Sequence, residues 1–155
     1  MHPASHLARI CGAVVAVALA ASSAAAQQGT ASDADKPVLT FDSDAVLVTL
    51  LIKPDRTSDF EFVLSRLKEA LQKSDKPERR QQAAGWQVFK SLQTVQGNAV
   101  YIMRLDPVVR GEEYDITRLI AETFPVEVQE IFPKYRDAFA GRVITELTPL
   151  VSMKQ

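Results

Sequence analysis

A single arginine interrupts one of the most apolar stretches of the 155-residue sequence. Arg104 lies in the run AVYIMRL of residues 99–105, whose other side chains are all apolar or aromatic. A guanidinium in such a strand can bind a carboxylate or phenolate ligand through two parallel hydrogen bonds. Because a buried arginine is rare unless it is paired, we favour the alternative that Arg104 reaches solvent and pairs with a neighbouring acid such as Asp106.

Other side chains suggest chemistry more weakly. Trp86 and Tyr101 could stack on an aromatic ligand, although aromatic residues more often serve a core or an interface. Glu127 and Glu130, with Asp137, could hold a metal ion, but the sequence offers no second ligand cluster. We interpret these carboxylates as a solvated helix face. The sequence therefore predicts no metal and no cofactor.

The first 26 residues have the pattern of a signal peptide. A short segment carrying Arg9 precedes an apolar run of about a dozen residues, which is shorter than a membrane span. Ala24 and Ala26 then satisfy the Ala-x-Ala rule for cleavage before Gln27. We therefore expect a bacterial protein that is exported to the periplasm or secreted, without a membrane span once the signal is removed.

Cleavage would remove every histidine and the single cysteine of the chain. His2, His6 and Cys11 all lie within the predicted signal. Sites of the Ser-His-Asp and Cys-His types, imidazole bases, His- or Cys-bound zinc, and disulfides are then excluded. The near-neutral net charge of −1 also predicts no nucleic-acid partner. No catalytic constellation is visible, so we expect a non-catalytic protein.

The first half of the domain predicts a strand, two helices and a second strand. Residues 45–52 form an uninterrupted apolar run, typical of a strand buried on both faces. A capping box from Ser58 to Glu61 opens an amphipathic helix, in which Leu64, Leu67 and Leu71 recur at helical spacing and charged residues such as Lys68 lie mostly on the other side. A short polar helix follows at 75–84. Around this short helix we interpret the basic cluster as a solvated face; its members are Lys73, Lys76, Arg79 and Arg80. A strand at 86–93 completes this half.

The second half predicts a hairpin, a long helix and a last strand. Residues 96–98 (Gln-Gly-Asn) indicate a tight turn into the strand at 99–105. The helical pattern of residues 115–140 contains Pro125 and Pro133, which should break or kink it. The last strand lies between residues 143 and 153, where Pro149 indicates an edge position or a bulge.

These elements follow the order β-α-β-β-α-β. The fold class is therefore α+β, a ferredoxin-like split sandwich in which a four-stranded antiparallel sheet carries its helices on one face. The strands at 45–52 and 99–105, apolar on both sides, should be central. We expect three segments: a signal peptide at 1–26, a disordered leader and lead-in at 27–44, and one domain at 45–155.

A sheet with helices on one face leaves its other face bare. Alternation places a mixed set of side chains there, and we predict that they line a ligand pocket: Arg104, Ser91, Gln93, Phe89 and Ile102. An open apolar face usually marks an interface. We therefore expect a homodimer that buries this face, with Leu47, Leu51 and Val100 contributing to the contact.

The element order and several local motifs resemble the dimeric α/β-barrel superfamily, which includes antibiotic-biosynthesis monooxygenase-like domains. The motifs are Lys53-Pro54-Asp55, Asp59-Phe60-Glu61 and Phe124-Pro125. The resemblance implies two sheets paired face to face around a ligand cavity. Some members are cofactor-free oxygenases and others bind haem; the haem-degrading members use a histidine, which the predicted mature chain lacks.

Three functions follow from these observations. The first is an exported dimeric barrel that binds a small hydrophobic ligand or a protein partner without catalysis. The second, implied by the resemblance, is a cofactor-free monooxygenase or isomerase acting on an aromatic or quinone-like substrate. The third is a structural subunit of an envelope assembly. A cavity lined by Arg104, Ser91 and Gln93 would favour the first two, and a filled barrel would favour the third.

Overall fold

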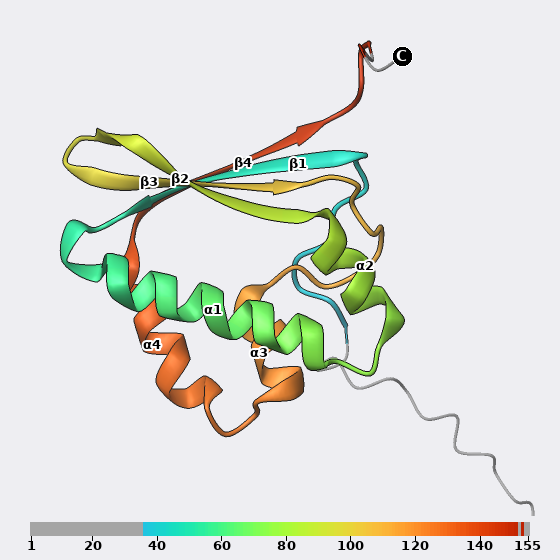
Figure 1. The fold of residues 1–155 in the computed structure, drawn as a ribbon, viewed down its shortest axis with the longest axis horizontal. Helices are drawn as coiled ribbons and strands as arrows, with labels where there is room; N and C mark the ends of the chain where they lie inside the picture. The colour runs from blue at the N-terminus through green and yellow to red at the C-terminus, as the bar shows by residue number, and fades with distance from the viewer. Residues whose placement is uncertain (1–35, 152, 154–155) are drawn as a thin grey trace, which may run out of the picture.

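The computed structural model describes residues 36–151 and residue 153, so the predicted signal peptide and residues 27–35 lie outside the described residues. Its elements run β1 (Ala45–Ile52), a 3-10 turn (Pro54–Arg56), α1 (Thr57–Lys73), α2 (Pro77–Gly85), β2 (Trp86–Val95), β3 (Asn98–Leu105), α3 (Ile116–Thr123), α4 (Val128–Ala138) and β4 (Phe139–Leu147). The helices lie on one side of the sheet (Figure 1). No helix of the described residues is long and apolar enough to cross a membrane.

The sheet confirms the predicted strand positions. Its order is β2-β3-β1-β4, and each neighbouring pair is antiparallel. The two central strands are the two segments whose residues are apolar on both faces. In β1 fully buried residues alternate with partly buried ones, as expected for a strand covered by helices on one side only. The ferredoxin-like α+β fold therefore follows from the strand order itself.

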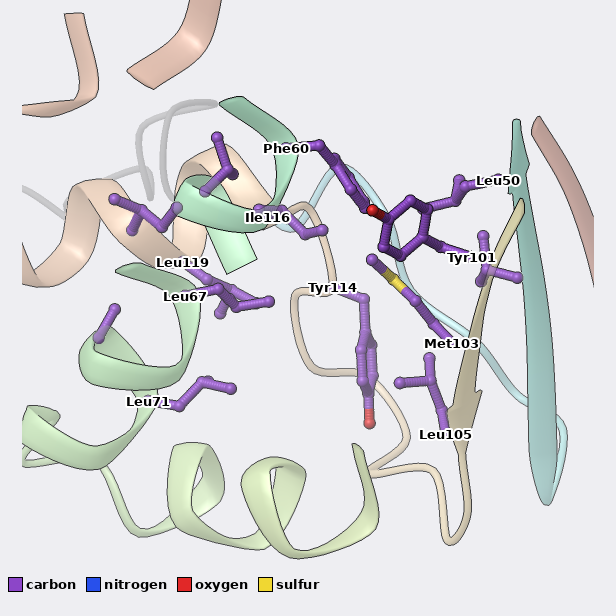
Figure 2. Packing of buried hydrophobic residues seen from close by; sticks show 14 of the residues in the cluster. Leu50, Phe60, Leu67, Leu71, Tyr101, Met103, Leu105, Tyr114, Ile116 and Leu119 are labelled. Carbon is purple, nitrogen blue, oxygen red and sulfur yellow. The ribbon is translucent and has the colours of Figure 1, made fainter. Parts of the chain in front are cut away.

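The core fills the space between the helices and the sheet. From β3, Tyr101, Met103 and Leu105 point toward the helices, where Leu67 and Leu71 of α1 meet them (Figure 2). Leu67 and Leu71 are four residues apart on α1, at the helical spacing that the sequence predicts. The lead-in to β1 also belongs to this core, because Phe41 is buried within it.

The start of α1 differs from the prediction. No side chain caps this helix, because the 3-10 turn at Pro54–Arg56 leads directly into it and places Ser58 inside its first turn. The predicted capping box is therefore wrong. Glu61, which should have closed the box, bonds instead to Lys90 of β2 and Tyr101 of β3.

The long helical pattern of the second half divides where it meets Pro125. Helix α3 ends at Thr123 and α4 begins at Val128, while Pro133 is accommodated inside α4. Asp115 caps α3 by accepting a hydrogen bond from the Arg118 backbone N–H at 3.0 Å. The last strand begins at Phe139, directly after α4, and ends at Leu147 rather than extending to residue 153.

The β2–β3 hairpin closes with a two-residue turn. Gln96 and Gly97 have φ values of 50° and 78°, the left-handed pair that a type I′ turn requires. The register of β2 against β3 shifts between Lys90 and Thr94. This irregularity leaves the first half of β2, from Trp86 to Lys90, as the part that runs evenly beside β3.

Gly85 fixes the junction between α2 and β2. A Cβ atom at this position would lie 2.6 Å from the carbonyl oxygen of Pro107. The Gly85 carbonyl also accepts a hydrogen bond from the Asp106 N–H at 2.9 Å. The close approach, which only glycine allows, holds the end of α2 against the end of β3 and sets the position of Trp86.

Candidate functional site

An apolar groove of about 420 Å³ runs between helix α1 and the edge strand β2, closed at one end by α2. We call it the apolar groove, and its lining residues are Leu64, Ser65, Leu67, Lys68, Leu71, Gln72, Ala83, Trp86 and Val88. The volume lies within the range of small-molecule sites. The groove therefore has the size and the lining of a site for a small apolar ligand.

Three elements supply the walls of this groove. Leu67 and Leu71 form part of the buried face of α1 that packs over the sheet (Figure 2). Trp86 and Val88 are alternate residues of β2, so both face the helices. Because β2 is an edge strand, nothing pairs beyond it among the described residues, and Val88 remains 39% exposed. The groove opens along this edge.

Trp86 connects the groove to the core. Its ring centroid lies 5.6 Å from that of Tyr114, whose hydroxyl accepts a hydrogen bond from the Val109 N–H at 2.8 Å. The Trp86 Nε1 atom is buried and has no hydrogen-bond partner among the described residues. A buried donor without an acceptor costs on the order of 1–3 kcal/mol. The indole N–H is thus a polar group that the described protein leaves unsatisfied.

An ion pair spans the two walls beyond Val88. The Lys90 ammonium donates to Glu61 Oε1 at 2.7 Å, and the Tyr101 hydroxyl donates to the same oxygen at 2.6 Å. The hydrogen bond from Lys90 lowers the pKa of Glu61, and the same bond raises the pKa of Lys90. Burial raises the pKa of Tyr101. At neutral pH the three groups therefore stay as carboxylate, ammonium and neutral phenol.

A second hollow, of about 480 Å³, lies at the opposite end of α2. We call it the polar cleft, and it is lined by Pro37, Lys76, Arg79, Gly111, Glu112, Glu113, Arg118, Ala121 and Glu122. Arg79 is 4% exposed, so its prediction as part of a solvated basic face was wrong. Its Nε and Nη2 donate to the two oxygens of Glu122 at 3.0 and 2.8 Å, and its Nη1 donates to Glu112 at 2.9 Å.

The charged side chains of the polar cleft form ion pairs with one another. The hydrogen bonds from Arg79 lower the pKa of Glu122, and those that it makes to Glu122 raise its own pKa. Glu113 accepts from the backbone N–H groups of Val38 and Leu39 at 2.7 and 3.0 Å. This carboxylate thus connects the lead-in segment to the loop that precedes α3. The hydrogen bonds of the polar cleft connect α2, the lead-in segment and the region around α3, and its carboxylates already have partners within the protein.

The predicted ligand residues divide between two places. Phe89 lies directly opposite Ile102 on the sheet face away from the helices, and Arg104 is on the same face. Arg104 reaches solvent and pairs with Asp106 at 3.1 Å, as the favoured alternative predicted. Ser91 and Gln93 fall in the irregular part of β2, where the Ser91 hydroxyl accepts from the Gln93 N–H at 3.0 Å. A pocket formed by all five remains a prediction.

The face without helices carries the apolar side chains that alternation placed there. We call it the open sheet face, and its residues include Leu47, Thr49, Leu51, Phe89, Val100, Ile102, Arg104, Val143, Thr145 and Leu147. Phe89 is 51% and Val143 60% exposed, whereas Val100 at the centre is almost covered by its neighbours. No described segment of the chain packs over this face.

The suggested carboxylate cluster on the last helix has other partners. Glu127 accepts two hydrogen bonds from Arg66 of α1 at 2.7 and 2.6 Å. Asp137 accepts from its neighbour Arg136 at 2.7 Å. The described residues include no group of three metal-ligating side chains close enough to hold an ion.

The residues of the apolar groove were not identified from the sequence as a site. The helical spacing of Leu64, Leu67 and Leu71 was recognised, but it indicates a core face equally well. Lys68 was assigned to the opposite, solvated side of the helix. The one usable signal was Trp86, a large aromatic at the start of an edge strand, which is half-buried there.

The comparisons with known proteins add little to this geometry. No protein-family model matches the chain, and no curated protein matches it. Among solved structures it is similar to a dimeric ferredoxin-like protein of unknown function from Thermobifida fusca YX. The two are 16% identical with a TM-score of 0.33, over 70% of this chain and 94% of that chain. The ferredoxin-like fold of this chain rests on its own strand order, β2-β3-β1-β4, and the similarity supports no function.

Proposed function

We propose that this protein is an exported binding protein that holds a small hydrophobic ligand in the apolar groove. The export rests on the sequence of the first 26 residues alone. The binding rests on one observation: a groove of about 420 Å³ whose floor is apolar and contains Trp86. Covering such a floor with a ligand removes its side chains from water, at about 25 cal/mol for each Å² of apolar surface.

The titratable groups whose pKa values are shifted follow one trend. Among the described residues, each resolved pKa shift moves a carboxyl group down or a lysine, arginine or tyrosine up. Burial raises the pKa of Tyr135 to about 12. A general acid or base works best with a pKa near the working pH. These shifts all lead away from neutrality, and none of the shifted groups lines the apolar groove, so the proposal rests on the apolar lining of the groove.

The test uses an uncharged fluorescent probe, N-phenyl-1-naphthylamine. We expect it to bind in the groove, with a rise in its own emission and a change in that of Trp86, the chain's only tryptophan. Val88→Asp places a charge on the apolar wall and should weaken binding about tenfold, since apolar contact supplies the affinity.

Val126→Asp is the matched control, because Val126 is an exposed valine outside the groove. It should leave the affinity unchanged, and circular dichroism should show both variants folded. A wild-type protein that leaves the probe dark, or equal affinities for the two variants, would overturn the proposed site.

We also propose that two copies pair through the open sheet face. Phe89, Val143 and Leu147 together expose apolar surface on one side of the sheet, and a contiguous patch of this kind usually marks an interface. A two-fold axis would bring the same patch of both subunits together, as in most homodimers. Burying it would remove the open side of the sheet from water.

Sedimentation velocity tests the pairing. The wild type should be a dimer at micromolar concentration, and Ile102→Asp should give monomers or aggregates because it buries a charge at the centre of the contact. Glu130→Lys on α4 is the control. A change at the nearby Glu127 would be a poorer control, because it would also break the hydrogen bonds between Glu127 and Arg66. A stable wild-type monomer would end the dimer hypothesis.

A further inference from the structure

We propose that the ligand of the apolar groove carries a carboxylate, and that Lys68 binds this head group while the apolar part lies on Trp86. The inference rests on the proposed function, because it names the chemistry of the ligand in that same groove. It assigns a specificity-determining role to a lysine that the sequence pattern placed on a solvated face.

The charges around the groove are unevenly distributed. Lys68 is the one charged residue in the groove lining, and no acidic side chain accompanies it there. Lys68 takes part in none of the ion pairs of the described residues. A lone ammonium beside an apolar floor is complementary to a molecule with an apolar body and one negative charge.

The neighbouring cations are already engaged. Lys73, one turn further along α1, pairs with Glu69 at 2.6 Å. Lys90 across the groove pairs with Glu61 at 2.7 Å. These pairs also neutralise the two carboxylates that are nearest to Lys68 along α1, Glu69 and Glu61. Lys68 is thus left as the group that can attract an anion.

The position of Lys68 suits recognition of a head group at the rim. Lys68 and Gln72 are four residues apart on α1, so their side chains lie one turn apart on the same side of the helix. Both are exposed, while Leu67 and Leu71 on the adjoining side are buried. An amphiphile with its chain along the leucines would present its carboxylate to Lys68, and the Gln72 amide could donate a second hydrogen bond.

The test compares two probes with the same apolar chain, decanoate and 1-decanol, below the concentrations at which they aggregate. Binding is followed through the emission of Trp86. We expect the wild type to prefer decanoate by about twofold to fivefold, the size of one exposed ion pair. Added salt should reduce this preference, because it screens the exposed charge.

Lys68→Met should abolish the preference while leaving the affinity for 1-decanol unchanged, and Lys68→Glu should reverse it. Arg80→Met removes an exposed cation of α2 that does not line the groove, and it should behave as the wild type.

Each possible result decides one of the two proposals. If neither probe changes the Trp86 emission, the proposed function fails and this inference fails with it. If both probes bind equally to the wild type, or if Lys68→Met keeps the preference, the groove binds apolar chains but the role of Lys68 is wrong. A preference that disappears in Lys68→Met, with 1-decanol binding intact, supports the carboxylate ligand.

Discussion

Helix α2 borders two hollows of similar volume that differ in almost every other respect. Its first turn contributes Arg79, and the residue before it contributes Lys76, to the polar cleft of about 480 Å³. Its last turn contributes Ala83 to the apolar groove of about 420 Å³. In the cleft buried and half-buried charges face one another in hydrogen-bonded pairs. In the groove an apolar floor faces solvent, beside one unpaired lysine.

This difference shows why volume alone does not identify a binding site. The carboxylates of the polar cleft gain little from a ligand, since Arg79 already supplies their hydrogen bonds. A ligand there would have to displace these bonds before making its own. A ligand in the apolar groove would not have to break such bonds. It would cover apolar surface that is otherwise in contact with water, which is favourable.

The largest expected effect comes from removing Arg79, the buried cation of the polar cleft. Arg79→Met should destabilise the protein by about 3 kcal/mol, because it removes the buried guanidinium that binds Glu112 and Glu122 and leaves Glu122 only its pair with the exposed Lys76. Urea unfolding measures the change in the free energy of unfolding. Arg80→Met, on the exposed side of the same helix, should stay within about 0.5 kcal/mol. Similar losses for the two variants would mean that Arg79 is solvated.

Acid should affect the two hollows differently. Arg79 holds the pKa of Glu122 below its ordinary value of 4.5. A lowered pKa in the folded state stabilises the protein above the unfolded-state pKa, and this contribution is lost as the pH falls through the folded-state value. As the pH falls below 4.5, the wild type should therefore lose more stability than Glu122→Gln.

The affinity of the apolar groove for an uncharged probe should stay constant from pH 5 to pH 8. Glu61 remains ionised and Lys90 protonated across that range, because their pKa values move outward. Urea unfolding at a series of pH values, with probe titrations alongside, checks both expectations. Parallel pH curves for Glu122→Gln and the wild type would contradict the assignment of the acid response to the cleft.

A smaller effect is expected at the far end of the apolar groove. Tyr101→Phe removes the 2.6 Å hydrogen bond to Glu61 and leaves the Lys90–Glu61 pair in place. The loss should be about 1 kcal/mol, the typical net value of one hydrogen bond. Thermal unfolding measures it, and an unchanged Tm would show that the bond is exchanged for water without cost.

The smallest effect is expected at Arg104, outside both hollows. Its pair with Asp106 is half exposed on both sides, and exposed pairs contribute roughly 0–1 kcal/mol. Arg104→Met should leave the stability of the subunit and the affinity of the groove nearly unchanged. Sedimentation equilibrium is the sharper measurement, because a tenfold change in the dissociation constant of the dimer would restore a role for Arg104 between two sheets.

Much of the fold could be predicted because its signals are local. Residues 45–52 and 99–105 are apolar on both faces, which assigns them to the centre of the sheet wherever the helices lie. Gly97 after Gln96 indicates the hairpin turn from backbone preference alone. The open sheet face followed from strict alternation, and the register placed Phe89 opposite Ile102 on that face.

The candidate site could not be predicted in the same way. The apolar groove exists because α1, α2 and β2 meet without fully covering the edge of the sheet, and this depends on the approach of Gly85 to Pro107. Side chains 24 positions apart, Leu64 and Val88, line it together. Helical spacing shows that Leu64 faces inward, but it does not show which strand ends beside it.

The sequence by itself determined the periodicity of each element, the central strands, the turn and the absence of histidine and cysteine beyond residue 11. Tertiary structure alone decided which charges pair between elements that lie far apart in the sequence, whereas the local pair of Arg104 with Asp106 was predicted. Arg79 looks like its exposed neighbour Arg80 in sequence, yet three carboxylate contacts bury it. Glu61 fits a capping box but bonds across to β2 and β3. Apolar patterns reflect local geometry, whereas the environment of a charge is set by partners that only folding brings within hydrogen-bond distance.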